Sequence, residues 1–286
     1  MAHPGLKFSG GKLAPRSDLR VGADSGAPLC GISSTTTVSD NQPGPSNNKQ
    51  AGNKVVTPVV TNGPKNGNFI VDFCNIRGLN SNINSVHQHL QTNKPHLLAL
   101  CETKVSSSTS IVNYLYPGYE LHSRFRRNFG VCLFARSDLS CQREEALEPK
   151  DFDVMWFKIT TLQTTRFICC LYRPPSDKQF RALFSSLANT IDFLQINHPN
   201  AEIAILGDFN VHNTNWLKYS NTNVDQGREA ESFAISCGLT QLLDEPTRIP
   251  DRDGEFASLL DLFLTTNPEI YTVTVNPPLG SSDHKL

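Results

Sequence analysis

The stretch "AEIAILGDFNVHN", residues 201–213, carries an apolar run into a group of polar side chains. Residues 203–206 have the composition of a buried strand, and Gly207 lets another backbone or a substrate approach closely. Asp208 and Asn210 follow two positions apart, so on an extended chain they face the same side. The pattern predicts a strand that brings a carboxylate and a carboxamide to the edge of a core. The alternative is an Asx-type turn after an ordinary strand.

Strand-like and helix-like segments alternate on both sides of this stretch. Short apolar segments predict strands, and segments with apolar residues every three or four positions predict helices. We expect Ser176 to cap the longest helix and Gly238 to end the last one. The fold class is therefore α+β, a four-layer α/β sandwich of two packed mixed β-sheets flanked by helices. Further strands are expected at residues 69–75, 95–103, 119–125, 129–139, 154–161 and 166–172, and helices at 81–93, 176–199 and 225–238.

Composition changes sharply near residue 67. Residues 1–67 are rich in Gly, Ser, Pro and Asn and hold seven basic against three acidic side chains. Such a segment buries too little apolar area to offset its ordering entropy, so we expect a disordered, low-complexity leader. It is either an inert leader or a nucleic-acid-binding tail. The whole chain has a net charge of −1, so residues 68–286 form an acidic domain that needs local basic patches or bound cations to hold a polyanion.

The eight cysteines include no C-x-x-C pair, and most lie in apolar, strand-like segments. This arrangement favours free buried thiols over a disulfide framework or a zinc site. No stretch approaches the roughly 18 apolar residues of a membrane span, and the N-terminus lacks an apolar signal region. We therefore expect an intracellular protein without a membrane segment. The cysteines in strand-like segments are Cys74, Cys101, Cys132, Cys169 and Cys170.

Polar side chains stand where several predicted strands end. Rigid strands can hold such groups together at one rim of a sandwich, where solvent or a substrate reaches them. Asp261 is different, because apolar neighbours surround it within "SLLDLFL", where a carboxylate is costly to bury. The candidate site residues are Asn75, Glu102, Tyr172, Asp208, Asn210, Asp261, Asp283 and His284.

Six motifs carry a family resemblance: "FCNIRGLN", "LALCETK", "LYRPPS", "ILGDFN", "SLLDLFL" and "SSDHKL". In this order and rough spacing they resemble the exonuclease–endonuclease–phosphatase superfamily, and more narrowly the apurinic-type endonuclease domain of non-LTR retrotransposon polyproteins. "GDFNVHNTNW", "YRPPS" and "KPHLLALCET" look like the jockey-type elements. Singly these motifs are weak, but six in register are specific. The resemblance covers residues 68–286 and implies a DNase I-like fold.

The resemblance implies a Mg²⁺-dependent endonuclease, with Mn²⁺ as the alternative cation. Its partner is DNA, in which it nicks one strand and leaves a 3′-hydroxyl for target-primed reverse transcription, in the nucleus. Phosphodiester hydrolysis needs a deprotonated water and compensation for charge on the phosphoryl oxygens. A hard cation supplies that compensation, and we expect Glu102 to bind it with Asn75 beside it.

The same resemblance assigns the remaining roles. His284 either hydrogen-bonds the phosphate or takes the proton from water, and Asp208 is the other candidate base or the acid for the leaving group. Asp261 is expected to orient the imidazole, and Asn210 to position the phosphate or water. Tyr172 could donate to a non-bridging oxygen. Asp283 joins the same catalytic group.

Each assignment has a plainer alternative. Glu102 could be an ordinary strand-end carboxylate, Tyr172 a rim aromatic, and Asp261 the partner of a basic residue. His284, three residues from the end, could belong to a frayed tail. Alternatives to an endonuclease are a catalytically inactive retrotransposon-derived remnant that only binds nucleic acid or a partner, and a phosphatase acting on lipids or nucleotides.

Two further stretches are expected to contact DNA. "RFRRN", residues 124–128, places Arg124, Arg126 and Arg127 at a hairpin tip, where they would neutralise phosphates or form a solvated turn. "RIPDRDGEF", residues 248–256, resembles the hairpin that lies against the DNA groove in retrotransposon endonucleases. The candidate contacts in and beside this second stretch are Thr247, Arg248 and Arg252.

The sequence departs from the family at two points. Arg77 stands where repair enzymes carry a second acidic metal-site residue, which leaves the number of metal ions open. The chain also stops two residues after His284, so we expect the closing strand of the family and the reverse transcriptase to be missing, as in a truncated gene copy or an exon product.

Overall fold

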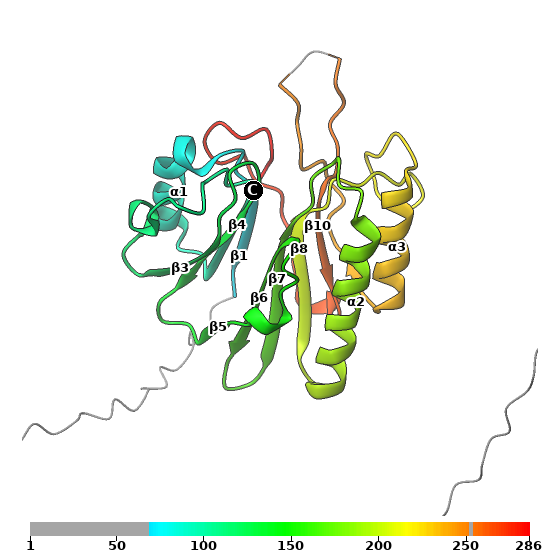
Figure 1. The fold of residues 1–286 in the computed structure, drawn as a ribbon, viewed down its shortest axis with the longest axis horizontal. Coiled ribbons are helices and arrows are strands. Elements are labelled where there is room, and N and C mark those ends of the chain that lie inside the picture. Colours follow the sequence, from blue (N-terminus) through cyan, green and yellow to red (C-terminus); the bar gives the residue numbers. More distant parts are fainter. Residues whose placement is uncertain (1–68, 252–253) are drawn as a thin grey trace, which may run out of the picture. The chain divides into compact units, whose positions relative to one another are not determined.

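The computed structural model describes residues 69–251 and 254–286 (Figure 1). The predicted leader, residues 1–67, lies outside the described residues, and so does Arg252. In the part that is described, two mixed β-sheets pack between helices, which confirms the predicted sandwich.

The first described sheet has four strands in the order β1-β2-β4-β3. β1 and β2 are parallel, and β4 runs antiparallel to both of its neighbours, β2 and β3. Every residue of β2 is buried, as expected of a strand covered on both faces. The strands are β1 (Val71–Asn75), β2 (Leu97–Cys101), β3 (Tyr119–Arg124) and β4 (Val131–Arg136).

The second described sheet has six strands in the order β5-β6-β7-β8-β10-β9. β7 and β8 are parallel, whereas β10 runs antiparallel to β8. The segment 203–206 lies inside the buried central strand β8, as its composition predicted. The strands are β5 (Cys141–Arg143), β6 (Asp153–Thr160), β7 (Thr165–Tyr172), β8 (Glu202–Asp208), β9 (Thr240–Gln241) and β10 (Asp261–Thr265).

Helices cover the outer face of each sheet. α1 packs on the first sheet, while α2 and α3 lie side by side on the second (Figure 1). A third apolar cluster, which includes Leu133, Phe157 and Cys170, fills the space between the sheets. The helices are α1 (Leu79–Asn93), α2 (Phe180–Asn197) and α3 (Asp225–Ser236), with 3₁₀ turns at Ile111–Tyr114, Glu145–Leu147 and Pro268–Ile270.

The ends of two helices test the predicted caps. α3 ends at Ser236, and Gly238 follows it with φ +66°, while the N–H of Leu239 donates to the carbonyl of Ala234, so the predicted stop at this glycine is confirmed. The predicted cap at Ser176 is wrong, because α2 begins at Phe180 and has no side-chain cap. Asp177 Oδ1 instead accepts a hydrogen bond from the N–H of Gln179.

The strand cysteines are free and buried, as predicted. Among the described helices, none combines the length and apolar character needed to cross a bilayer.

Candidate active site

Three adjacent strands of the second sheet bring three candidate side chains into one row. Tyr172 of β7 is the Cα partner of Asp208 in the parallel pairing of β7 with β8. Asp208 is in turn the partner of Asp261 in the antiparallel pairing of β8 with β10. All three residues are buried. Because Asp208 and Asp261 are direct partners across β8 and β10, the strand register places their carboxylates close together.

Asn75 joins this row to the first sheet. Its side-chain Nδ2 donates to Glu102 Oε2 at 2.7 Å and to Asp208 Oδ2 at 2.8 Å, while its Oδ1 accepts from the N–H of Arg77. Asn75 ends β1, and Glu102 follows β2 in a left-handed backbone conformation with φ +53°. In this arrangement the amide nitrogen faces the carboxylates, so Asn75 positions them as a donor, and its role as a metal ligand stays a prediction.

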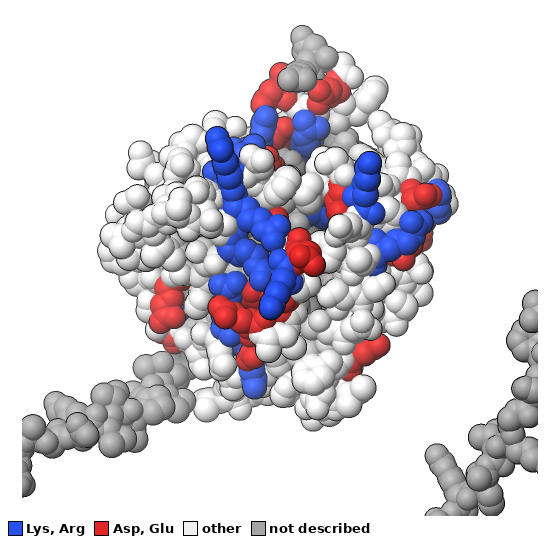
Figure 2. Space-filling model, in the orientation of Figure 1, with Lys and Arg blue, Asp and Glu red and all other residues white. Residues whose placement is uncertain are grey.

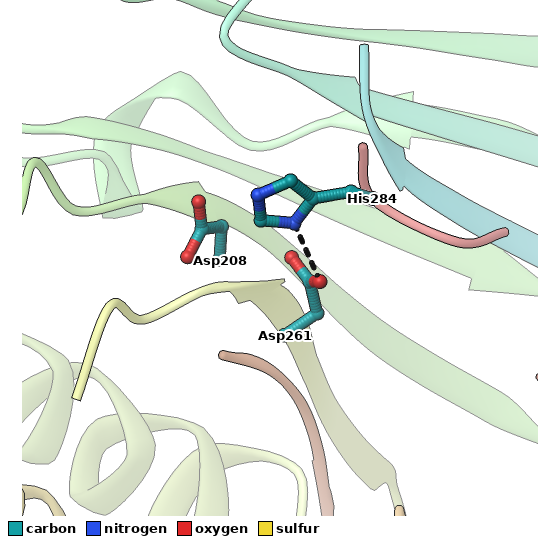
Figure 3. A group of neighbouring side chains, drawn as sticks. All are labelled: Asp208, Asp261 and His284. Carbon is teal, nitrogen blue, oxygen red and sulfur yellow. Dashed lines mark hydrogen bonds and ion pairs between the residues drawn. The ribbon is translucent and has the colours of Figure 1, made fainter. Parts of the chain in front are cut away.

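His284 lies beside the carboxylates of Asp208 and Asp261 (Figure 3). Its Nδ1 is 2.8 Å from Asp261 Oδ2, which is the contact expected of a carboxylate that orients an imidazole. The backbone around the histidine is held on both sides, because its N–H donates to Ser282 Oγ and the next N–H, of Lys285, donates to the carbonyl of Thr247. His284 is buried, so it does not belong to a frayed tail.

Burial and charge shift the pKa values of these groups in a consistent way. Burial raises the pKa of Asp208 and the neighbouring Asp261 raises it further, to about 7, against the opposing effects of His284 and Asn75. Burial alone would lower the pKa of His284, but Asp261, Asp208 and Asp283 together raise it to about 9. The imidazolium is therefore the favoured form near neutral pH, whereas Asp208 is poised to gain or lose a proton there.

A buried arginine holds the loop that follows Asp208. The guanidinium of Arg173 donates to the carbonyl oxygens of Phe209, Pro174 and Asn210, and its side chain is almost fully buried. The Arg173 N–H donates to the carbonyl of Asp208, and Asn210 Nδ2 donates back to the carbonyl of Arg173. Asp208 also forms an Asx turn, since its Oδ1 accepts a hydrogen bond from the N–H of Asn210. Sequence reasoning missed Arg173, although it lies in the "LYRPPS" motif.

Tyr172 is buried beside the carboxylates. Burial raises the pKa of its phenol above the ordinary value, and the charges of Glu102 and Asp208 raise it further. The phenol therefore keeps its proton and can act as a hydrogen-bond donor. Its ring centroid lies 6.0 Å from that of Phe129, on the loop between β3 and β4.

The carboxylate oxygens at this rim are suitable ligands for a hard divalent cation. Glu102 Oε1 lies 2.6 Å from the ammonium of Lys104, so this carboxylate already faces a positive charge that is half-exposed and can move away. Asp261 Oδ1 is buried and has no hydrogen-bond partner among the described residues. Ligand atoms of Asp208, Asp261 and His284 lie within 4.8 Å of one another, and this acidic cluster could hold a metal.

The predicted DNA contacts of the first stretch have different environments. Arg124 donates to the carbonyls of Pro149 and Phe152 and pairs with Glu148, so its guanidinium is held within the protein. Arg126 pairs with Asp153 and is partly exposed, whereas Arg127 is exposed. On the side of the molecule drawn in Figure 2, Lys and Arg side chains form a band with acidic side chains beside it.

The second predicted stretch begins beside the histidine. Thr247 is buried, and its hydroxyl accepts hydrogen bonds from the N–H groups of Leu260 and Asp261, so it supports Asp261 from beneath. Arg248 Nε is 3.0 Å from Asp283 Oδ2 and is partly exposed. Asp283 is buried, and its Oδ1 lies 3.9 Å from His284 Nε2.

Comparisons with known proteins agree with this architecture. Residues 166–286 match the protein family described as endonuclease-reverse transcriptase. The endonuclease domain of TRAS1, a telomere-specific non-LTR retrotransposon, is similar to the structure with a TM-score of 0.60 and 18% identity, over 76% of this chain and 95% of that one.

Two further solved structures share the fold. The 3′-5′ exonuclease NExo from Neisseria meningitidis gives a TM-score of 0.59 and 17% identity, over 75% of this chain and 96% of that one. The AP endonuclease LMAP from Leishmania major gives 0.60 and 15%, over 74% and 85%. A search of curated proteins found no match.

Proposed function

We propose that the chain is a member of the exonuclease–endonuclease–phosphatase superfamily and a metal-dependent endonuclease that hydrolyses phosphodiester bonds of DNA. The observation that carries the proposal is the link through Asn75. One amide nitrogen holds Glu102 and Asp208, from different sheets, while Asp261 beside Asp208 holds His284. Hydrolysis requires a carboxylate that binds the cation, a proton acceptor and a hydrogen-bond donor to the phosphate, and we assign these roles to Glu102, Asp208 and His284.

Glu102 is the residue that would hold the cation, which we propose is Mg²⁺. A bound Mg²⁺ supplies a Lewis acid that compensates the charge developing on the phosphoryl oxygens. Lys104 would leave Glu102 for the solvent, since its side chain is 41% exposed. Asn75 keeps the carboxylates of Glu102 and Asp208 apart at a fixed spacing, because its Nδ2 bonds to both.

The environment of each remaining group favours one role. Asp208, whose pKa is raised to about 7, can accept a proton from water at neutral pH and return it. His284, whose pKa is raised to about 9, would donate from its imidazolium to a phosphate oxygen while Asp261 holds its other nitrogen. Tyr172 would donate to a non-bridging oxygen. Asn210 would position the phosphate or the water from the adjacent loop.

The biological role that we propose is nicking of target DNA to leave a 3′-hydroxyl that primes reverse transcription. Support comes from the match of residues 166–286 to a family described as endonuclease-reverse transcriptase. The similar TRAS1 domain is the endonuclease of a non-LTR retrotransposon. An enzyme with this role would act on chromosomal DNA in the nucleus.

Supercoiled plasmid incubated with the full chain tests the proposal. We expect Mg²⁺-dependent conversion to open circles, loss of nicking in EDTA, and loss in Glu102→Gln and Asp208→Asn variants. Asp244→Asn is a matched control, because Asp244 is exposed and pairs with Lys218. Extension of the nicks by a DNA polymerase would show the 3′-hydroxyl. DNA binding without nicking under any divalent cation would refute the enzyme and support an inactive, nucleic-acid-binding remnant.

A further inference from the structure

A second charged cluster lies next to the proposed catalytic groups. Asp283 is buried, and each of its carboxylate oxygens contacts a different arginine: Oδ1 is 3.1 Å from Arg77 Nη1, and Oδ2 is 3.0 Å from Arg248 Nε. Arg77 follows β1, whereas Arg248 pairs with Ser258 at the base of a hairpin whose described residues are 248–251 and 254–258. One buried carboxylate thus brings together two guanidinium groups from distant parts of the chain.

Each arginine also pairs with an acidic residue of the hairpin. Arg77 Nη1 is 3.2 Å from Asp251 Oδ2, and Arg248 Nη2 is 3.3 Å from Glu255 Oε2. The side chains of Asp251 and Glu255 are 73% and 40% exposed, while that of Asp283 is 3% exposed. The ion pairs therefore differ in strength. Separation of the buried Asp283 from its arginines would be strongly destabilising, whereas an exposed ion pair contributes at most about 1 kcal/mol.

The charge of the cluster depends on where the hairpin acids lie. With both acids in place, two guanidinium groups contact three carboxylates. Asp251 and Glu255 then occupy guanidinium donors that a phosphate could use. Release of these two acids removes two negative charges from the cluster and leaves donors of both guanidinium groups free for an anion. The geometry is that of an anion site occupied by carboxylates of the same chain.

We propose that Arg77 and Arg248 form a binding site for a DNA backbone phosphate next to the scissile position, and that Asp251 and Glu255 occupy it in the free protein. Asp283 Oδ1 lies 3.9 Å from His284 Nε2, so the site adjoins the catalytic imidazole. DNA binding exchanges the two exposed carboxylates for a phosphate, while Asp283 keeps both arginines in place. The inference rests on the proposed function, because it takes DNA as the ligand.

The hairpin is built for such an exchange. Its base is fixed, since Arg248 and Ser258 exchange backbone hydrogen bonds and the N–H of Ile249 donates to the carbonyl of Asp283. Asp251 and Glu255 lie beyond this base. The side chains of Asp251 and Glu255 can therefore leave the two arginines without breaking the backbone contacts that hold Asp283 and His284.

Fluorescence anisotropy of a labelled DNA duplex tests the site. Binding is measured with the full chain in EDTA over a range of salt concentrations, and a denaturing gel verifies that the duplex stays intact. The variants are Arg77→Gln, Arg248→Gln and the double variant Asp251→Asn/Glu255→Gln. The matched control is Asp225→Asn/Asp244→Asn, which removes two exposed acids that pair with Arg228 and Lys218 elsewhere.

We expect each arginine variant to bind about five- to tenfold more weakly and to lower the slope of log K against log salt by about 1. The double variant of the hairpin acids should bind about three- to tenfold more tightly, since two weak ion pairs no longer compete with the phosphate. The control double variant measures the effect of net charge alone and should gain less.

Two results would overturn the site: hairpin-acid variants that bind no more tightly than the control, or arginine variants that keep the wild-type salt slope. If either result comes with normal plasmid nicking, the site is wrong while the proposed function stands. Tight, salt-dependent binding with the expected changes but no nicking would instead support the site and refute the enzyme. A chain that binds no DNA refutes both.

Discussion

Arg173→Lys tests whether the buried guanidinium holds the loop that follows Asp208. Arg173 is 1% exposed, and Nε donates to the carbonyl of Phe209 at 2.5 Å, Nη1 to that of Pro174 at 3.1 Å, and Nη2 to that of Asn210. Lysine keeps the positive charge near Asp208 but has one compact ammonium in place of a planar fork. It can reach one of these three diverging carbonyls and loses the hydrogen bonds to the other two.

The expected loss follows from those two hydrogen bonds. Hydrogen bonds that involve a charged group contribute about 1.5 kcal/mol or more each, so the free energy of unfolding should fall by about 3 kcal/mol. For a domain of this size the melting temperature should drop by about 6–12 °C. Nicking should fall about 100-fold even where the variant is folded, because small displacements of the proposed catalytic groups Asp208 and Asn210 are costly.

Urea denaturation followed by circular dichroism measures the stability, and plasmid nicking at a temperature where the variant is folded measures the activity. Arg228→Lys is the control, because Arg228 is 60% exposed on α3 and its substitution should change stability by less than about 0.5 kcal/mol. If Arg173→Lys unfolds at the same urea concentration as the wild-type protein, the three carbonyl contacts do not hold the loop and the reasoning is refuted.

Three further predictions concern the same rim. The ordinary pKa of Asp208, 3.8, is raised to about 7, so ionisation of this carboxyl lowers the free energy of unfolding as pH rises through this range. Asp208→Asn should therefore be at least as stable as the wild-type protein in urea at pH 8, while its nicking activity falls about 10³-fold. His284 has an ordinary pKa of 6.5 that is raised to about 9, so its stabilisation is complete below pH 6.5 and is lost as pH rises through 9. His284→Gln should lack this pH dependence, which amounts to about 3 kcal/mol, and parallel curves for both proteins from pH 6 to 10 would contradict the ion pair. Gly130→Ala should lower the free energy of unfolding by about 2 kcal/mol, since φ is +96° and the new Cβ would lie 2.6 Å from Thr103 Oγ1; an unchanged urea midpoint would argue against this close contact.

The sequence was sufficient to predict elements whose signal is local. β2 and β8 are buried on both faces, so their apolar runs identify them without knowledge of their neighbours. The row of polar residues at strand ends was also predictable, because each one terminates such a run. Asn75, Glu102 and Asp208 came from this pattern, and the structure places them within hydrogen-bonding distance.

Contacts between distant segments were not predictable in the same way. Arg124 lies in a basic stretch that was expected to contact DNA, and nothing in that stretch indicates its hydrogen bonds to the carbonyls of Pro149 and Phe152, 25 and 28 positions away. Thr247 was also expected to contact the substrate, and no local pattern indicates the hydrogen bond from the N–H of Asp261 to its buried hydroxyl. Arg77 was noted as a departure from the family, and its pairing with Asp283 joins positions from the two ends of the domain. No local pattern contains these partners.

The proposed catalytic row is the last layer of the core between the two sheets. Side chains alternate along a strand, and Leu206 and Tyr172 belong to the cluster between the sheets, so Asp208 faces the same space. Along β10, Leu262 and Leu264 face the helices, which leaves Asp261 on the inter-sheet side. A slip of one residue would turn each carboxylate into the apolar layer beneath α2 and α3. The apolar packing that selects the register therefore also fixes the geometry of the proposed catalytic row, and a fold with this core cannot lose that register without losing the row.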